Sequence, residues 1–110
     1  MTPTQTAYYN AQRSIRDLEA RGYVAANVEK WMPFQSRRQD LFGFADVIAF
    51  KESHAEILLV QTTTKSNMSA RKKKILANDT AKKWLAAGHH IEIQGWYQVG
   101  RYWHCDYITL

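Results

Sequence analysis

Oxygen donors that could bind a metal ion stand near the middle of the sequence, where two apolar segments follow each other closely. The carboxylate of Asp46 begins the apolar run 47–50, and Gln61 and Thr62 follow the apolar run 57–60. Mg²⁺ prefers oxygen ligands and keeps several waters, and a bound ion can activate water and neutralise phosphate charge. Because basic residues come soon after these donors, the pattern indicates metal-assisted attack on a phosphodiester.

Positive charge is concentrated in one short region of the chain. Of its 15 basic and 10 acidic residues, seven basic and one acidic residue lie between Lys65 and Lys83, which leaves eight basic and nine acidic residues elsewhere. The net charge of +5 therefore belongs to this region, as expected of a surface that binds the phosphate backbone of nucleic acid. A solvated helix face is the alternative for such a run of charges.

The residues predicted to contact nucleic acid include two uncharged ones at the start of the next helix. Ser66 and Asn67 could bond phosphate through their side chains or through the helix N-terminus, with ordinary helix capping as the alternative. The full predicted set is Lys65, Ser66, Asn67, Arg71, Lys72, Lys73 and Lys74.

Hydrophobic periodicity predicts the elements that must position these residues. The two apolar runs indicate adjacent central strands covered on both faces. A helix is predicted to start at Pro3, with Thr2 as its N-cap, and to stop at Gly22. Further elements are predicted as strands at 23–31, 46–50, 57–63, 89–96 and 102–110 and a helix at 71–87. The order α-β-β-β-α-β-β describes a single α/β domain over 1–110.

The composition is that of a folded protein, and the sequence shows no membrane span, internal disulfide or cofactor motif. The chain has 110 residues, of which 45% are hydrophobic, and its apolar runs are far shorter than the roughly 20 residues that span a bilayer. Its one cysteine, Cys105, cannot form an internal disulfide, which is typical of a reducing compartment. We therefore expect a soluble cytoplasmic protein without a membrane partner. The sequence has no glycine-rich phosphate loop, so no small-molecule cofactor is expected.

The stretch 40–74 resembles the core of the PD-(D/E)XK nuclease superfamily, most nearly its small Holliday-junction-resolvase-like and VRR-NUC-like members. In that family an aspartate begins the second strand, and a Glu-x-Lys triplet lies near the end of the third. Asp46 matches the aspartate, while Gln61, Thr62 and Thr63 stand at the triplet. The resemblance implies a restriction-endonuclease-like core, with a mixed central β-sheet flanked by helices.

The resemblance also implies a Mg²⁺ or Mn²⁺ site. Asp46, the side-chain oxygen of Gln61 and the backbone carbonyl of Thr62 would hold the ion. The first helix of these families often carries a further glutamate, and Glu19 is predicted on the apolar side of the helix, whereas Asp17 is predicted to point the opposite way. A salt bridge at the rim is the alternative for Glu19.

Three lysines and one further acid could also belong to this site. Because Thr63 replaces the lysine of the triplet, Lys65 is expected to act as the cation beside the attacking water if the strand continues that far. Lys72 and Lys73 are alternatives. Asp40 is a second acid near Asp46 and is ranked below Glu19.

The predicted function is metal-dependent endonucleolytic hydrolysis of DNA, with junctions and flaps among the expected substrates. Gln61 contributes no negative charge, so a catalytically inactive nucleic-acid-binding module on the same fold is the alternative. A third reading is a small interaction or inhibitor protein whose basic face meets an acidic protein.

The C-terminal segment is rich in aromatic residues and predicts a contact surface. One small domain offers one site, and cutting two strands usually needs two, so a homodimer through the terminal hairpin is expected. The aromatic side chains could instead stack on bases, as in single-strand binders, or belong to the core. They are Trp96, Tyr97, Trp103 and Tyr107.

Overall fold

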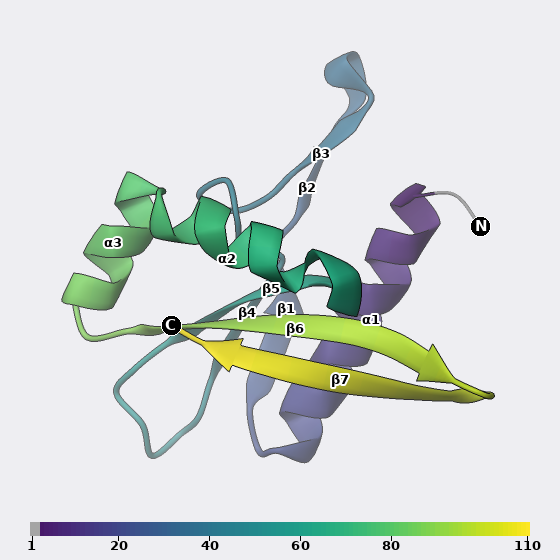
Figure 1. Ribbon diagram of the computed structural model, residues 1–110. Helices are drawn as coiled ribbons and strands as arrows, with labels where there is room; N and C mark the ends of the chain where they lie inside the picture. The colour runs from purple at the N-terminus through teal and green to yellow at the C-terminus, as the bar shows by residue number, and fades with distance from the viewer. Residues whose placement is uncertain (1–2) are drawn as a thin grey trace.

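The computed structural model describes residues 3–110 as a mixed five-stranded sheet with helices on both faces (Figure 1). The strand order is β1-β4-β5-β6-β7, in which β5 and β6 run parallel and the other neighbours run antiparallel. The α/β class with a mixed sheet is therefore confirmed. The strands are β1 (Val24–Asn27), β4 (Val47–Phe50), β5 (Leu58–Thr64), β6 (His90–Val99) and β7 (Tyr102–Thr109).

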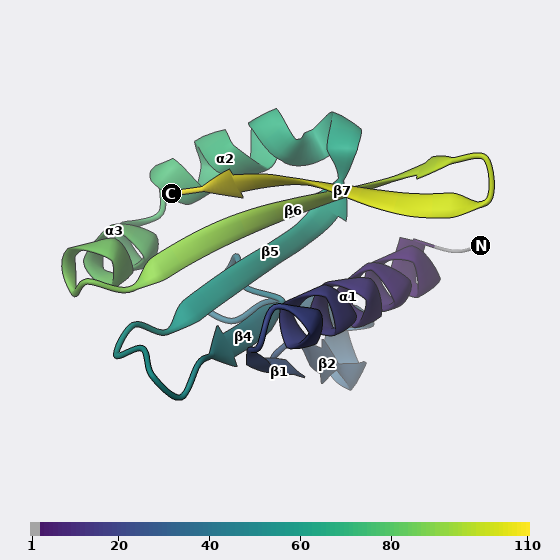
Figure 2. The same cartoon turned by 90° about the horizontal axis from the view of Figure 1, so that it is seen from below.

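Helices cover the two faces of this sheet unequally (Figure 2). Helix α1 (Pro3–Ala20) lies on one face, and α2 (Met68–Leu76) with α3 (Asp79–Ala86) lies on the other. Side chains alternate along β5, so Leu58 and Val60 pack in the cluster under α1, and Leu59 packs in the cluster under α2 and α3. The prediction that the central strands are covered on both faces is confirmed.

The strand expected at 23–31 is interrupted. The Asn27 side chain accepts a hydrogen bond from the Glu29 backbone N–H at 2.8 Å, a turn geometry that ends β1 at Asn27. The chain then forms a separate hairpin, β2–β3, in which β2 (Lys30–Met32) pairs with β3 (Arg37–Gln39). This hairpin projects from the body of the protein (Figure 1).

The helix expected at 71–87 is also two helices. Asn78 interrupts it because the Asn78 side chain accepts a hydrogen bond from the Ala81 N–H at 2.9 Å and caps α3. Helix α2 begins at Met68, earlier than expected. The proposed N-cap at Thr2 lies outside the described residues. None of the helices within 3–110 combines the length and apolar character that crossing a membrane requires.

Gly95 on β6 is needed because the chain entering α2 passes close over the sheet. A Cβ at Gly95 would overlap the Met68 side chain and would lie 3.1 Å from the Cα of Lys65. We expect Gly95→Ala to lower the free energy of unfolding by about 1–2 kcal/mol, because overpacking forces neighbours to move. Urea unfolding measures this, and adding Met68→Ala should recover part of the loss. Wild-type stability in the single variant would contradict this close packing.

Candidate metal centre and nucleic-acid groove

Three carboxylates converge at the base of the β2–β3 hairpin. Glu29 precedes β2, Asp40 follows β3, and Asp46 precedes β4. One oxygen of each lies within 4.8 Å of the other two. The hairpin therefore brings together acids that are spread over the segment 29–46 of the sequence.

Backbone hydrogen bonds on both sides hold Asp46 in place. Its carbonyl accepts the N–H of Val28 at 2.9 Å, and its own N–H donates to the carbonyl of Val60 at 2.9 Å. The backbone of Asp46 is therefore fixed between the end of β1 and strand β5, and only 4% of the residue is exposed.

One carboxylate oxygen of Asp46, Oδ2, accepts three hydrogen bonds. The donors are Gln61 Nε2 at 2.8 Å, the Thr62 backbone N–H at 2.8 Å and the Thr62 hydroxyl at 3.3 Å. Gln61 Nε2 also donates to the Thr62 carbonyl at 3.3 Å. Both atoms facing the amide are acceptors, so its NH₂ end must point at them. The Gln61 amide nitrogen, and not its predicted ligand oxygen, therefore contacts the other two oxygens that the resemblance assigns to the ion.

The electrostatics of this centre favour a positive charge. Burial is the largest cause that raises the pKa of Asp46 well above its ordinary value, and the nearby charges of Asp40 and Glu29 add to it, while the Thr62 N–H opposes it. Burial also raises the pKa of Glu29, against the effect of Arg38, whose guanidinium lies 2.7 Å from the Glu29 carboxylate. Among residues 3–110, these three acids share one cationic partner, Arg38. The raised pKa values mean that the acids hold protons in the absence of a metal ion, and a bound cation would displace those protons.

Helix α1 presents Asp17, and not Glu19, toward the sheet, so the predicted orientation of Glu19 is wrong. Glu19 is exposed and does not belong to the acidic group at Asp46. The two acids lie about 100° to either side of the fully buried Leu18, and only the side of Asp17 faces β6 and β7. Helical periodicity predicted the side of Glu19, because the pattern within one helix does not show where β6 and β7 lie.

The predicted placement of Lys65 on the face of Gln61 is also wrong. Strand β5 ends at Thr64, and Lys65 begins a 3₁₀ turn, so the alternation of side chains does not extend to it. The Lys65 Nζ lies 3.3 Å from Asp106 and 4.4 Å from the centre of the Tyr97 ring. Lys72 and Lys73 are exposed on α2.

A groove adjoins the acidic centre through Thr62. It has a volume of about 370 Å³ and runs between α1 and the start of α2. Asn67 and Arg71, both predicted to contact nucleic acid, line it, whereas the Ser66 hydroxyl lies 3.2 Å from that of Thr64. The remaining lining residues are Thr6, Ala7, Asn10, Thr62, Thr63 and Thr64.

Glu29 is a candidate metal ligand that the sequence pattern did not single out, and Asp40 is one that was ranked below Glu19. Neither follows an apolar run that predicts a central strand. Their common signal is that they flank the segment 30–39, which becomes the β2–β3 hairpin. Acids at both ends of a hairpin must lie near each other, but the sequence pattern predicts only a strand and a loop there.

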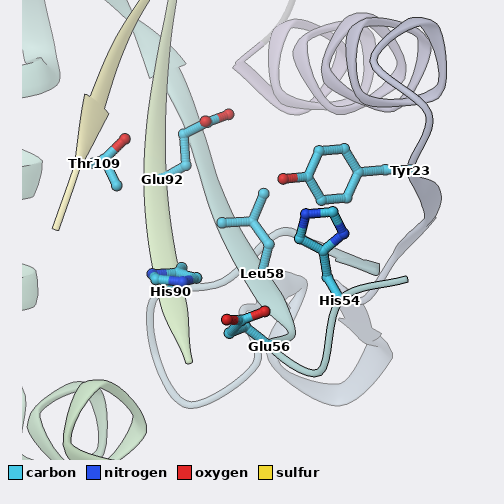
Figure 3. A pocket seen from close by; sticks show the side chains of 7 residues that line it. All are labelled: Tyr23, His54, Glu56, Leu58, His90, Glu92 and Thr109. Carbon is cyan, nitrogen blue, oxygen red and sulfur yellow. The ribbon is translucent and has the colours of Figure 1, made fainter. Parts of the chain in front are cut away.

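A second pocket lies at the opposite end of the sheet, where β5 and β6 begin (Figure 3). Its volume is about 280 Å³, and it contains two histidines and two glutamates. Among residues 3–110, these side chains form no group of three that could share a metal ion, and Glu92 is already paired with Arg21. The pocket is therefore a weaker candidate. It is lined by Tyr23, His54, Glu56, Leu58, His90, Glu92 and Thr109.

Comparison with known proteins gave no match: no family model fits the chain, and no curated protein or solved structure matches it.

Proposed function

We propose that the protein is a divalent-metal-dependent endonuclease that hydrolyses DNA phosphodiesters, with junctions and flaps as expected substrates. The observation that carries this proposal is the convergence of Glu29, Asp40 and Asp46 beside a groove that contains Arg71. Carboxylates that bind a cation next to a phosphate-binding surface are the elements that metal-assisted phosphodiester hydrolysis requires.

The three carboxylates fit Mg²⁺ or Mn²⁺, which take oxygen ligands. Glu29 and Asp40 supply the negative charge that Gln61 lacks, so the hairpin compensates for the glutamate missing from the triplet. When bound, such an ion would lower the pKa of its water and neutralise charge on the phosphate. The experiment that tests the proposal is cleavage of branched and linear DNA with Mn²⁺, compared between the wild type and Asp46→Asn.

The surrounding residues have positioning and binding roles in this proposal. Thr62 and Gln61 orient Asp46 through their hydrogen bonds to Oδ2, and Arg38 holds Glu29. Arg71 lies in the groove, where its guanidinium can pair with a phosphate through two parallel hydrogen bonds.

The fold is compatible with a PD-(D/E)XK-like core, which we propose on the basis of its strand directions. Strands β1, β4 and β5 form an antiparallel unit, and α2 with α3 connects β5 to its parallel neighbour β6. The β2–β3 hairpin and β7 would then be additions to that core.

A nucleic-acid-binding module without catalysis is the second candidate. It is favoured by the Gln61 amide, which donates to both Asp46 and the Thr62 carbonyl and so satisfies those oxygens without an ion. Calorimetry separates the two candidates, because the binding module should take up no Mn²⁺ with or without DNA.

The basic residues of α2 should determine how strongly DNA binding depends on salt. Changing Arg71, Lys72, Lys73 and Lys74 together to Gln should weaken binding and reduce the salt slope by about one unit for each phosphate that is no longer neutralised. Fluorescence anisotropy at several salt concentrations measures the slope. Lys82→Gln is the matched control, since Lys82 is exposed on α3 and lies 3.7 Å from Asp79. An unchanged slope in the quadruple variant would place the DNA surface elsewhere.

We also propose a homodimer formed through the terminal hairpin. Strand β7 stands at the edge of the sheet, and no further strand of the described chain pairs with it. Such an edge can pair with a second copy. Light scattering that gave a monomer mass at high protein concentration would contradict the dimer.

A further inference from the structure

The hairpin formed by β6 and β7 extends past the ends of the other strands (Figure 2). Strand β6 is parallel to β5, so the Val99 end of β6 lies at the same end of the sheet as Thr64 and the groove. A nucleic acid bound in the groove would therefore pass near the hairpin.

A cleft of about 460 Å³ lies between this hairpin and α1. Trp103 on β7 is 43% exposed, and the Arg13 guanidinium carbon on α1 lies 3.6 Å from the centre of its ring. Arg16 and Asp17 line the same side of the cleft, and Trp96 and Tyr107 line the other. The Asp17 carboxylate is already paired with Arg21 at 3.1 Å.

The two arginines of this cleft form no ion pair with an acid in the described part of the chain. Arg21 and Arg38 form ion pairs with glutamates, whereas Arg13 and Arg16 form none within residues 3–110. Arg13 instead donates to the neutral side chain of Asn10 at 2.9 Å. Burial lowers the pKa of Arg13, and the neighbouring charge of Arg16 lowers it further, so the Arg13 cation is partly desolvated beside a second cation. An anion bound there would offset the repulsion between the two cations.

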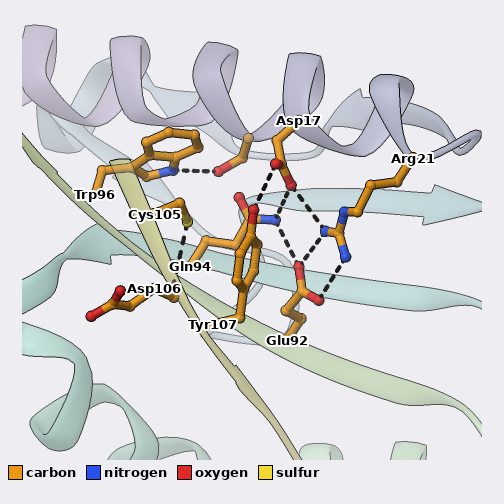
Figure 4. A network of polar contacts seen from close by, with 9 residues as sticks. Asp17, Arg21, Glu92, Gln94, Trp96, Cys105, Asp106 and Tyr107 are labelled. Carbon is orange, nitrogen blue, oxygen red and sulfur yellow. Dashed lines mark hydrogen bonds and ion pairs between the residues drawn. The ribbon is translucent and has the colours of Figure 1, made fainter. Parts of the chain in front are cut away.

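The walls of the cleft are held together before any ligand binds (Figure 4). The Trp96 indole N–H donates to Ser14 at 2.9 Å, and the Tyr107 hydroxyl donates to Asp17 at 2.6 Å. These bonds join α1 to β6 and β7. Burial raises the pKa of the Cys105 thiol to about 12, so the cleft contains no reactive thiolate at neutral pH.

We propose that this cleft binds an unpaired nucleotide, with the base stacked on the Trp103–Arg13 layer and the phosphate near Arg16. Aromatic rings beside cations are the usual platform for single-stranded nucleic acid, whose bases are free to stack. In a duplex the bases are already stacked inside the helix. The inference rests on the proposed function and narrows its substrate to DNA with a single-stranded segment, such as a flap or a splayed end.

The test measures the affinity of the protein for a labelled oligothymidylate of about twelve nucleotides and for a blunt duplex. Both measurements are made in EDTA, which removes metal ions and so prevents hydrolysis. Trp103→Ala should weaken oligothymidylate binding about tenfold, as expected for the loss of one base stack, and change duplex binding less than about twofold. Trp103→Phe, which keeps a ring, should retain most of the affinity. Trp31→Ala is the control, because Trp31 is 53% exposed on the distant β2–β3 hairpin.

Three results would overturn the inference. They are equal loss of affinity in the Trp103→Ala and Trp31→Ala variants, equal loss for oligothymidylate and duplex, and no difference between Trp103→Phe and Trp103→Ala. If Trp103→Ala fails to fold by circular dichroism, Trp103→Phe and Arg16→Gln keep the test decisive. Because the assay contains no metal, failure of the nuclease proposal would appear separately, as absent cleavage in Mn²⁺.

Discussion

Replacing Asp46 with asparagine should abolish DNA cleavage, with a loss of at least about 10³-fold, because a catalytic metal ion supplies several kcal/mol of transition-state stabilisation. The same change should stabilise the protein in EDTA. The asparagine side chain would keep an acceptor oxygen for the Thr62 N–H and would stay neutral beside Glu29 and Asp40 without taking up a proton on folding. Loss of activity together with a gain in stability is the signature of a buried acid retained for function.

Thermal unfolding with and without Mn²⁺ measures both parts of this prediction. Mn²⁺ should raise the melting temperature of the wild type and leave that of Asp46→Asn unchanged, because only a species that binds the folded state stabilises it. Asp79→Asn is the matched control, since the Asp79 side chain is 90% exposed and lies outside the acidic group. DNA binding in EDTA should persist in both variants. Full cleavage by Asp46→Asn would exclude this centre as the active site.

Arg21→Ala should lower the free energy of unfolding by about 2–3 kcal/mol, somewhat less than for a fully buried pair, because the Arg21 side chain is 36% exposed. Its guanidinium makes two hydrogen bonds to Glu92, at 2.7 and 3.2 Å, and lies 3.1 Å from Asp17 (Figure 4). The Glu92 side chain is 8% exposed, so removing Arg21 leaves an uncompensated buried carboxylate.

Urea unfolding measures this change in stability. Replacing both partners, as Arg21→Met with Glu92→Met, should restore much of the loss, because no charge then remains buried. Lys82→Ala is the control, since its pair with Asp79 is exposed and should contribute less than about 0.5 kcal/mol. Equal effects of Arg21→Ala and Lys82→Ala would show that the Arg21 network does not stabilise the fold.

Features that depend on neighbouring positions in the chain could be predicted from the amino-acid sequence. The apolar runs on either side of the turn at 51–56 predicted β4 and β5, because a strand covered on both faces needs nearly every side chain to be apolar. The position of Asp46 at the start of β4 followed from the same pattern. Helical spacing in the first twenty residues likewise predicted α1.

Which side chains meet depends on how the separate elements pack, and this could not be predicted from local sequence patterns. Helical periodicity placed Glu19 with the apolar residues and Asp17 opposite them, but β6 and β7 lie over the side of α1 that carries Asp17. Glu29 and Asp40 lie beside Asp46 because the turn at Asn27 ends β1 and leads into the β2–β3 hairpin. No apolar pattern in the sequence predicts this hairpin. Local periodicity constrains each element separately, whereas the convergence of side chains depends on how separate elements pair, turn and pack.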